Sequence, residues 1–253
     1  MPITKRQRTA RLAMIASGTV AAMAAATFAP AQGSDAPTAQ GTRTHRVILS
    51  GLDNPRQLSL TAGGALIIAE AGHGARNPDN CSGSGEDAFC IGQTGEVTRM
   101  RIGGHPRVVM DRLLSGAGRD GSFAVGADGA GKRPGGPFFA IVTEAPPDVV
   151  PEGVPGWQSG KLLAERKNGS LRVVANIARF EHRHDVDGEG VESNPYSLLA
   201  LKKKVLVADA AGDYIAQVNR RGRVSVWAEM PEYGRRIDAV PTVVTKGHDG
   251  FVY

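Results

Sequence analysis

The hydrophobic pattern of this chain is organised around one stretch, Asn54 to Gly72, which recurs with changes at Asn194 to Gly212. In both copies Asn-Pro precedes a short apolar run, a turn, three apolar residues and then Ala-acid-Ala. Proline at a strand start, Gly or Lys at the turn and β-branched residues after it predict two short strands joined by a tight turn. A third copy begins at Pro241 and places residues 251–253 on the three apolar positions of 205–207. Because one hairpin cannot bury its own apolar face, recurring hairpins predict stacked or radial β repeats.

Other apolar and alternating runs supply the remaining strands. We expect them at residues 44–49, 95–102, 107–110, 137–143, 161–165, 171–175, 214–218 and 224–227. Pro195 and Pro241 lie about 46 residues apart, which is typical of one four-stranded propeller blade with its loops. The sequence therefore predicts an all-β fold, a β-propeller with about three blades and the start of a fourth. Segment 121–136 is dominated by Gly, Asp and Pro and matches an inner strand poorly.

The N-terminal segment has the pattern of an export signal. Basic residues precede an uncharged run from Leu12 to Phe28, and Ala29-Pro30-Ala31 supplies the small residues recognised by a signal peptidase. The run is short and Ala-rich for a membrane span, which disfavours the alternative of an anchor. We predict a signal peptide at 1–31, a flexible lead-in at 32–44 and a partial propeller at 45–253. The protein is expected to be secreted by the general route, with no stable membrane anchor after cleavage.

The net charge of +5 belongs mainly to this signal, where Lys5, Arg6, Arg8 and Arg11 lie. The mature part is close to neutral, so we expect no nucleic-acid partner. The chain ends on apolar residues inside an expected strand, and the strand expected at 44–49 has no last blade to close. We therefore expect a C-terminally truncated fragment with three blades in an open arc.

Cys81 and Cys90 lie nine positions apart in a Gly-rich loop. In an exported protein such a pair favours a local disulfide. A metal site would need four ligands, and neither another Cys nor a properly spaced His is nearby in the sequence.

The densest polar cluster, residues 181–189, connects one expected blade to the next. Asp185, Asp187 and Glu189, at alternate positions around a glycine, are candidate calcium ligands, and a solvated polar loop is the alternative. Connections of this kind lie at the mouth of the central channel of a propeller, where ligands usually bind. His182 and His184 are therefore candidates for lining the mouth, although two histidines alone do not complete a zinc site.

Asn54 and Asn194 lie where inner strands begin, so they are either further residues of the channel mouth or simple turn starters before proline. Glu70 and Asp209 occupy matching repeat positions and are expected to bond to backbone across a blade junction. Two glycine-rich matches to phosphate-binding patterns, at 116–121 and 126–132, lack the helix that such motifs require. No catalytic residue is predicted, because the chain contains neither a G-x-S-x-G elbow nor an H-E-x-x-H pair.

Three groups of motifs together resemble the ScyD/ScyE family of secreted β-propeller proteins. They are Gly-Leu-Asp-Asn-Pro-Arg at 51–56, the paired cysteines followed by Gly-Glu-Val-Thr-Arg at 95–99, and Val-Glu-Ser-Asn-Pro-Tyr at 191–196 with Val-Ala-Asp-Ala-Ala-Gly at 207–212. The resemblance covers residues 47–253 and implies secretion and a propeller of the six-bladed type. It implies no established activity.

The function expected from these features is non-catalytic binding or scaffolding outside the cell, with an unknown extracellular ligand or protein as partner and no cofactor apart from a possible calcium ion. The alternative is a propeller enzyme, either a calcium-dependent lactonase or a quinone-dependent sugar dehydrogenase. These enzymes share the blade signature of proline, apolar run and Ala-acid.

Overall fold

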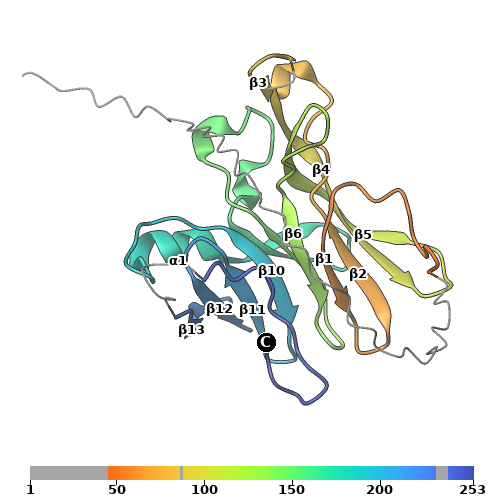
Figure 1. Ribbon diagram of the computed structural model, residues 1–253, viewed down its shortest axis with the longest axis vertical. Coiled ribbons are helices and arrows are strands. Elements are labelled where there is room, and N and C mark those ends of the chain that lie inside the picture. The colour runs from red at the N-terminus through yellow and green to blue at the C-terminus, as the bar shows by residue number, and fades with distance from the viewer. Residues whose placement is uncertain (1–44, 86–87, 232–238) are drawn as a thin grey trace, which may run out of the picture. The chain divides into compact units, whose positions relative to one another are not determined.

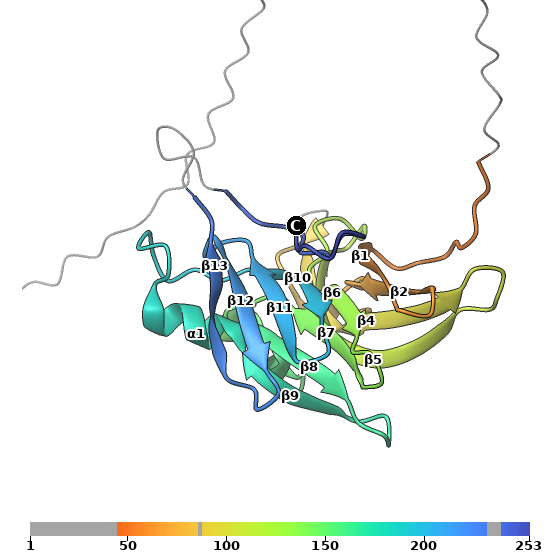
Figure 2. The same cartoon turned by 90° about the horizontal axis from the view of Figure 1, so that it is seen from below.

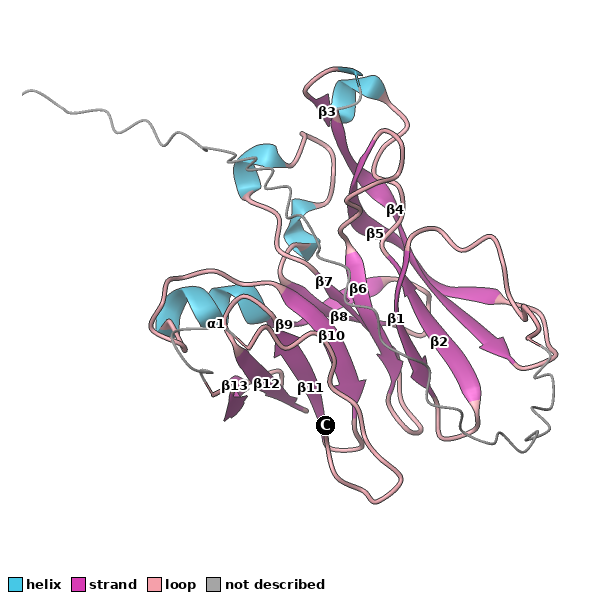
Figure 3. Cartoon of the chain, in the orientation of Figure 1, coloured by secondary structure: helices cyan, strands magenta, loops and turns pink. Residues whose placement is uncertain are grey.

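The computed structural model describes residues 45–85, 88–231 and 239–253 of the 253-residue chain. The predicted signal peptide and the lead-in lie outside the described residues. The described part is mostly β-structure, with three antiparallel sheets and one α-helix (Figures 1 and 3). None of the helices in it is long and apolar enough to span a membrane.

Each sheet is a meander of four strands, as expected for a propeller blade. The first contains β1 (Pro55–Leu60), β2 (Ala65–Glu70), β4 (Phe89–Arg101) and β5 (Arg107–Gly118), with the short β3 (Cys81–Ser82) beside β4. The second contains β6 (Ala127–Lys132), β7 (Phe138–Val142), β8 (Lys161–Glu165) and β9 (Leu171–Asn176). The third contains β10 (Pro195–Ala200), β11 (Lys204–Asp209), β12 (Tyr214–Asn219) and β13 (Val224–Glu229).

One hydrogen bond recurs in all three sheets and shows that they are copies of one unit. The amide of the residue after the second strand donates to the carbonyl of the residue before the first strand. The three bonds are Ala71 N to Asn54 O at 3.0 Å, Thr143 N to Gly126 O at 2.9 Å, and Ala210 N to Asn194 O at 2.9 Å. The prediction of a propeller with three four-stranded blades is confirmed.

The hydrophobic cores lie between the blades, and the second blade contributes to a core on each of its two faces. Along β7, Ala140 and Val142 contribute to the core shared with the first blade, whereas Phe139 and Ile141 contribute to the core shared with the third. Alternate side chains of a strand point to opposite faces, so one short apolar run serves two cores.

The inner strand of the second blade, β6, lies in the segment that matched an inner strand poorly. That expectation was wrong, and the reason is a close approach of neighbouring chains. A Cβ on Gly129 would lie 2.8 Å from the Cα of Ser197 and 2.7 Å from Ile141 Cγ2. A Cβ on Gly131 would lie 2.8 Å from Leu198 Cδ1. Glycine is therefore required by packing here, although it weakens the local strand pattern.

Gln57 on β1 connects the three inner strands. Its side-chain amide donates to Leu198 O at 2.9 Å, and its Oε1 accepts from both Ala130 N and Leu198 N at 3.1 Å. A Cβ on Gly129 would lie 2.9 Å from this oxygen. The Gln57 side chain therefore bridges β1, β6 and β10, three strands that lie next to one another in Figure 2.

Residues 45–50 form no strand, which corrects the strand expected at 44–49. None of the described strands pairs with them, and Val47 is 79% exposed. An extended segment without a hydrogen-bonded neighbour cannot form a ladder.

The C-terminal segment forms the start of a fourth repeat, in a register one residue from the expected one. Lys246 pairs with Val252, and Thr245 exchanges backbone hydrogen bonds with Tyr253. Val244 N donates to Ser197 Oγ of the third blade at 3.1 Å, as Ala130 N of the second blade donates to Gln57 of the first. Because Ala200 pairs with Val205 in the third blade, Val252 matches Val205. The longer turn shifts the pairing by one residue and therefore places Phe251 outside the paired positions.

The expected loop at 181–189 begins inside a helix, α1 (Ile177–His184). The Asn176 side chain accepts from Arg179 N and caps its first turn, and Asp185 ends it in the left-handed conformation at φ 44°. The expected position of this segment, between β9 and β10, is confirmed. Its helical start changes which acidic side chains meet.

The disulfide between Cys81 and Cys90 is present, as predicted. The two residues lie directly opposite each other where β3 pairs with β4.

Candidate functional site

The second residues of the three inner strands meet at one end of the blades. Arg56, Asp128 and Tyr196 follow the strand starts Pro55, Ala127 and Pro195, which pair with the ends of their second strands in the same way. Together they line a cavity of about 320 Å³, which we call the mouth cavity. Its other lining residues are Ala124, Val125, Thr143, Glu144, Ser193 and Asn194.

Asp128 is the buried acid of the mouth cavity, with only 3% of its side chain exposed. Its Oδ1 lies 3.6 Å from Arg56 Nε, and the Arg56 guanidinium also donates to Ala124 O. Burial raises the pKa of Asp128 to about 7, against the opposing effect of the Arg56 charge. A carboxyl group that titrates near neutrality can donate or accept a hydrogen bond at the same site.

Asn194 is held at the rim of the mouth cavity by its neighbours. Its Oδ1 accepts from Thr143 Oγ1 at 2.8 Å, and its backbone N donates to Asp209 Oδ1 at 2.7 Å. Asp209 is fully buried and also accepts from Ser193 Oγ at 2.6 Å. Burial raises the pKa of Asp209, although these hydrogen bonds act in the opposite direction. Asp209 therefore fixes the backbone that presents Asn194.

Glu70 has the equivalent role in the first blade, where its Oε2 accepts from Asp53 N at 2.7 Å. Glu70 and Asp209 thus bond to backbone, as expected, but each does so within its own blade. The expectation of bonds across a blade junction was wrong, because the segment before each inner strand lies beside the end of the second strand of the same blade.

Glu144 lies between the mouth cavity and a second cavity of about 480 Å³, which also contains His182, Lys161 and Arg179. His182 Nε2 is 3.1 Å from Glu144 Oε2. Burial raises the pKa of Glu144, and the nearby His182 acts against this shift. His182 of α1 is therefore linked to the mouth cavity through Glu144.

The other two residues expected at the channel mouth lie elsewhere. Asn54 has a φ of 51°, and its Nδ2 donates to Gly72 O at 2.9 Å, so its side chain is bonded to the segment that follows β2. His184 folds back on its own helix, with its ring stacked on Phe180 at 4.2 Å and Nδ1 2.7 Å from Phe180 O. Neither residue lines the mouth cavity.

The acids after α1 meet in a set that differs from the expected one. Carboxylate oxygens of Glu181, Asp185 and Asp187 lie within 4.8 Å of one another, and Glu189 is not a member of this group. Glu181 takes part because α1 places it one helical turn before Asp185.

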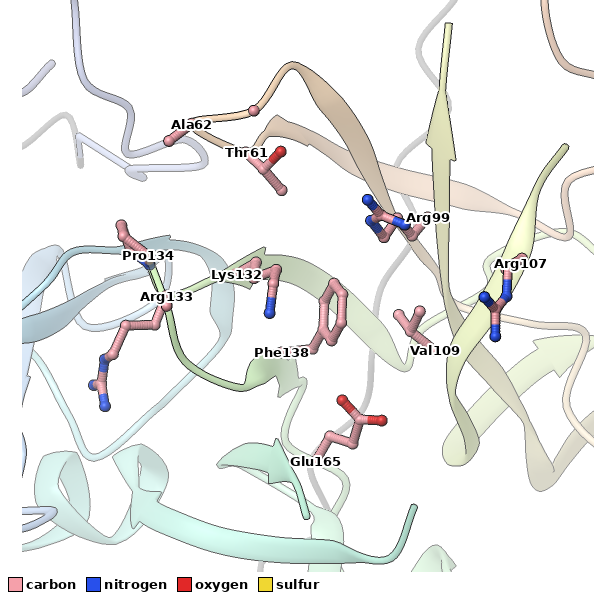
Figure 4. A pocket seen from close by; sticks show the side chains of 12 residues that line it. Thr61, Ala62, Arg99, Arg107, Val109, Lys132, Arg133, Pro134, Phe138 and Glu165 are labelled. Atoms are coloured by element: carbon pink, nitrogen blue, oxygen red, sulfur yellow. The ribbon is translucent and has the colours of Figure 1, made fainter. Parts of the chain in front are cut away.

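A further cavity of about 520 Å³ lies beyond the opposite ends of β1 and β6, and its charged residues are mainly basic. Lys132 Nζ lies 4.2 Å from the centroid of the Phe138 ring, whereas the Arg133 side chain points away from Lys132 and Phe138 (Figure 4). Arg99, Arg107 and Glu165 complete the charged lining.

Sequence reasoning missed Arg56, Asp128, Tyr196 and Glu144. The first and third could have been found, because each follows the proline of a recognised repeat. Asp128 could not be aligned with them while β6 was not recognised as an inner strand.

No family model matches the chain, and neither does any curated protein. Among solved structures, it is similar to virginiamycin B lyase from Staphylococcus aureus, with 9% identity and a TM-score of 0.40 over 79% of this chain. A catalytically inactive form of that lyase with quinupristin gives 12% identity and a TM-score of 0.39 over 81%. The chain spans 62% and 64% of the length of these two structures.

The PQQ-bound aldose sugar dehydrogenase from Streptomyces coelicolor is similar at 13% identity, with a TM-score of 0.28 over 73% of this chain and 84% of that one. The propeller assignment itself rests on the three sheets and their recurring hydrogen bond.

Proposed function

We propose that this protein is a secreted, non-catalytic β-propeller of the ScyD/ScyE type that binds a small, hydroxyl-rich ligand, such as a saccharide, in the mouth cavity. One observation carries the proposal, namely that the equivalent residues Arg56, Asp128 and Tyr196 of three blades line one cavity. Ligands bind preferentially in concave sites where a few polar groups fix their orientation.

The chemistry of the lining supports a neutral polar ligand. Arg56 provides donors, Asp128 provides an acceptor or a donor near neutral pH, and Tyr196 provides an aromatic surface with a hydroxyl group. A cavity of about 320 Å³ suits a molecule of monosaccharide or disaccharide size. The Cys81–Cys90 disulfide supports the extracellular part of the proposal.

The pairing of the polar side chains favours binding over catalysis. Asp128 is next to Arg56, His182 is next to Glu144, and Asn194 is bonded to Thr143. None of these pairs joins a nucleophile to a general base, which is the arrangement required for covalent catalysis.

The second candidate function is a propeller enzyme, and one observation favours it. A pKa of about 7 suits Asp128 to general acid–base chemistry at neutral pH. The enzyme would be either a calcium-dependent lactonase or a quinone-dependent sugar dehydrogenase.

Thermal melting of the mature protein against a panel of neutral mono- and disaccharides tests the binding proposal. We expect a rise in Tm with at least one saccharide, and a loss of affinity of about tenfold or more in Tyr196→Ala, which corresponds to about 1.4 kcal/mol. Trp227→Ala, an exposed aromatic residue on β13, is the matched control and should retain the response. A panel without any Tm shift would contradict the saccharide class.

Lactone hydrolysis with calcium and dye reduction with pyrroloquinoline quinone separate binding from catalysis. We expect neither activity above the level of an Asp128→Asn variant. Turnover that this substitution abolishes would favour the enzyme.

A further inference from the structure

The connection between α1 and β10 brings three carboxylates together away from the mouth cavity. Glu181 comes from the last turn of α1, Asp185 ends the helix, and Asp187 lies in the turn that follows. One oxygen from each lies within 4.8 Å of the others. Three negative charges at this separation repel one another unless a proton or a cation neutralises them.

Glu181 supplies an observation independent of the clustering. The residue is fully buried, and its Oε2 has no hydrogen-bond partner, although Oε1 accepts from Val186 N at 3.1 Å. A buried carboxylate oxygen without a donor has a large desolvation cost. The same carboxylate reaches the other two acids, so a cation bound among them would neutralise a buried charge whose second oxygen has no donor.

Each aspartate of the turn accepts a backbone hydrogen bond through one of its two oxygens. Gly190 N donates to Asp185 Oδ1 at 3.0 Å, and Glu189 N donates to Asp187 Oδ1 at 2.9 Å. These bonds orient both carboxylates, and within the described part of the chain no hydrogen bond to either Oδ2 is found. The chain from residue 185 to residue 190 thus presents oxygen atoms on the side of Glu181.

The donor set favours one class of cation. The three side chains offer only oxygen, and the two nearby histidines are engaged elsewhere, His182 with Glu144 and His184 with Phe180. Zinc and copper sites normally include nitrogen or sulfur ligands, whereas calcium takes six to eight oxygens, including backbone carbonyls and water.

We propose that Glu181, Asp185 and Asp187 form a calcium site that fixes the connection between the second and third blades. The ion would tie the end of α1 to the turn that leads into β10. This site is independent of saccharide binding, since none of the three residues lines the mouth cavity.

Calorimetric titration of chelator-treated protein with calcium chloride, together with melting in calcium and in EGTA, tests the site. We expect binding and a higher Tm in calcium, with a weaker response to magnesium. Glu181→Gln and Asp187→Asn should each lower calcium affinity by about tenfold or more, because ligand charge sets the affinity of such sites.

Two comparisons separate lost calcium binding from a general effect of the substitutions on folding. Glu181→Gln removes a buried charge, so in EGTA its Tm should equal or exceed that of the wild-type protein, which distinguishes lost binding from failed folding. Glu189→Gln is the matched control in the same turn and should retain the calcium response. The proposal is overturned by a wild-type Tm that ignores both calcium and EGTA, or by loss of the response in Glu189→Gln but not in Glu181→Gln.

Discussion

At the residue scale, Asp128 shows how burial gives an ordinary carboxyl group an unusual property. It occupies the same repeat position as Arg56 and Tyr196, yet only its side chain is both charged and almost fully enclosed. The Arg56 charge at 3.6 Å offsets only part of the cost of that enclosure. The folded protein therefore holds the Asp128 proton to a higher pH than the unfolded chain does.

Asp128 should make stability depend on pH with a definite sign. Its pKa is about 7 when folded and 3.8 without these surroundings, so folding takes up a proton between these values. The free energy of unfolding should therefore fall as pH rises from about 4 to about 7, by up to ~4 kcal/mol. Relative to wild type, Asp128→Asn should be more stable at pH 8 than at pH 4.5 in thermal melts.

Asp148→Asn, at an exposed acid in a short 3₁₀ helix, is the control for this experiment. Its stability difference from wild type should be the same at both pH values. If Asp128→Asn behaves in the same way, the proposed shift of the Asp128 pKa is wrong.

Gly129 should not tolerate even a methyl group. Gly129→Ala places its Cβ 2.8 Å from the backbone of Ser197, which cannot move aside as a flexible side chain could. We expect the free energy of unfolding in urea to fall by about 1–3 kcal/mol. Gly63→Ala, in a turn where nothing lies within 4 Å of the new Cβ, should change stability little and is the matched control. Equal effects of the two substitutions would argue against the close packing of β6 and β10.

At the scale of elements, the inner hairpin of each blade is the unit that the sequence pattern predicts most clearly. The same backbone bond closes the inner hairpin of each blade. In two blades an acid at the end of the second strand, Glu70 or Asp209, also accepts from a backbone amide just before the first strand. Elements added to this unit, such as β3 with its disulfide and α1 with its acidic turn, lie in the connections. The connections therefore carry the differences between the blades.

The disulfide closes a short loop, so its benefit should be modest. The double substitution of Cys81 and Cys90 by Ser should lower the free energy of unfolding by ~2–3 kcal/mol at most, according to the chain-entropy account. Thermal melts with and without reductant measure this, and reductant should leave the Tm of the double variant unchanged. Alkylation without reductant followed by mass spectrometry should find no labelled thiol in the wild-type protein.

At the scale of the whole molecule, Gln57 departs from the usual rule of repeat proteins. Units of a repeat array normally contact only their neighbours, so stability is a sum of local terms. Gln57 instead bonds the first blade to both the second and the third. The inner strands are thereby coupled beyond nearest neighbours.

Gln57→Ala should reduce both stability and cooperativity. It leaves Ala130 N, Leu198 N and Leu198 O without these partners, at a cost of roughly 2–4 kcal/mol. Hydrogen exchange should show amides of the third blade opening at lower free energy than those of the first. Gln217→Ala removes side-chain hydrogen bonds to Ser225 and Lys204 within the third blade only, so it is the control and should have little effect. Uniform exchange across the blades of Gln57→Ala would contradict this coupling.

The sequence by itself determined the features that depend on neighbours along the chain. Hairpins beginning at Pro55 and Pro195 follow from local turn chemistry and alternation, and their recurrence predicted the propeller. Cys81 and Cys90 are close in sequence and export is predicted, so their disulfide could be expected as well.

The tertiary structure alone decided which distant side chains meet. Gly129 is unfavourable in a strand by local propensity, and only the packing of β10 against it explains its presence. Asp128 aligns with Arg56 and Tyr196 only once β6 is known to be an inner strand. Alternation suggested Asp185, Asp187 and Glu189 as a set, but the helical period of α1 brings Glu181 to the first two. These outcomes depend on close packing and on burial, which take effect only when segments far apart in the sequence are brought together.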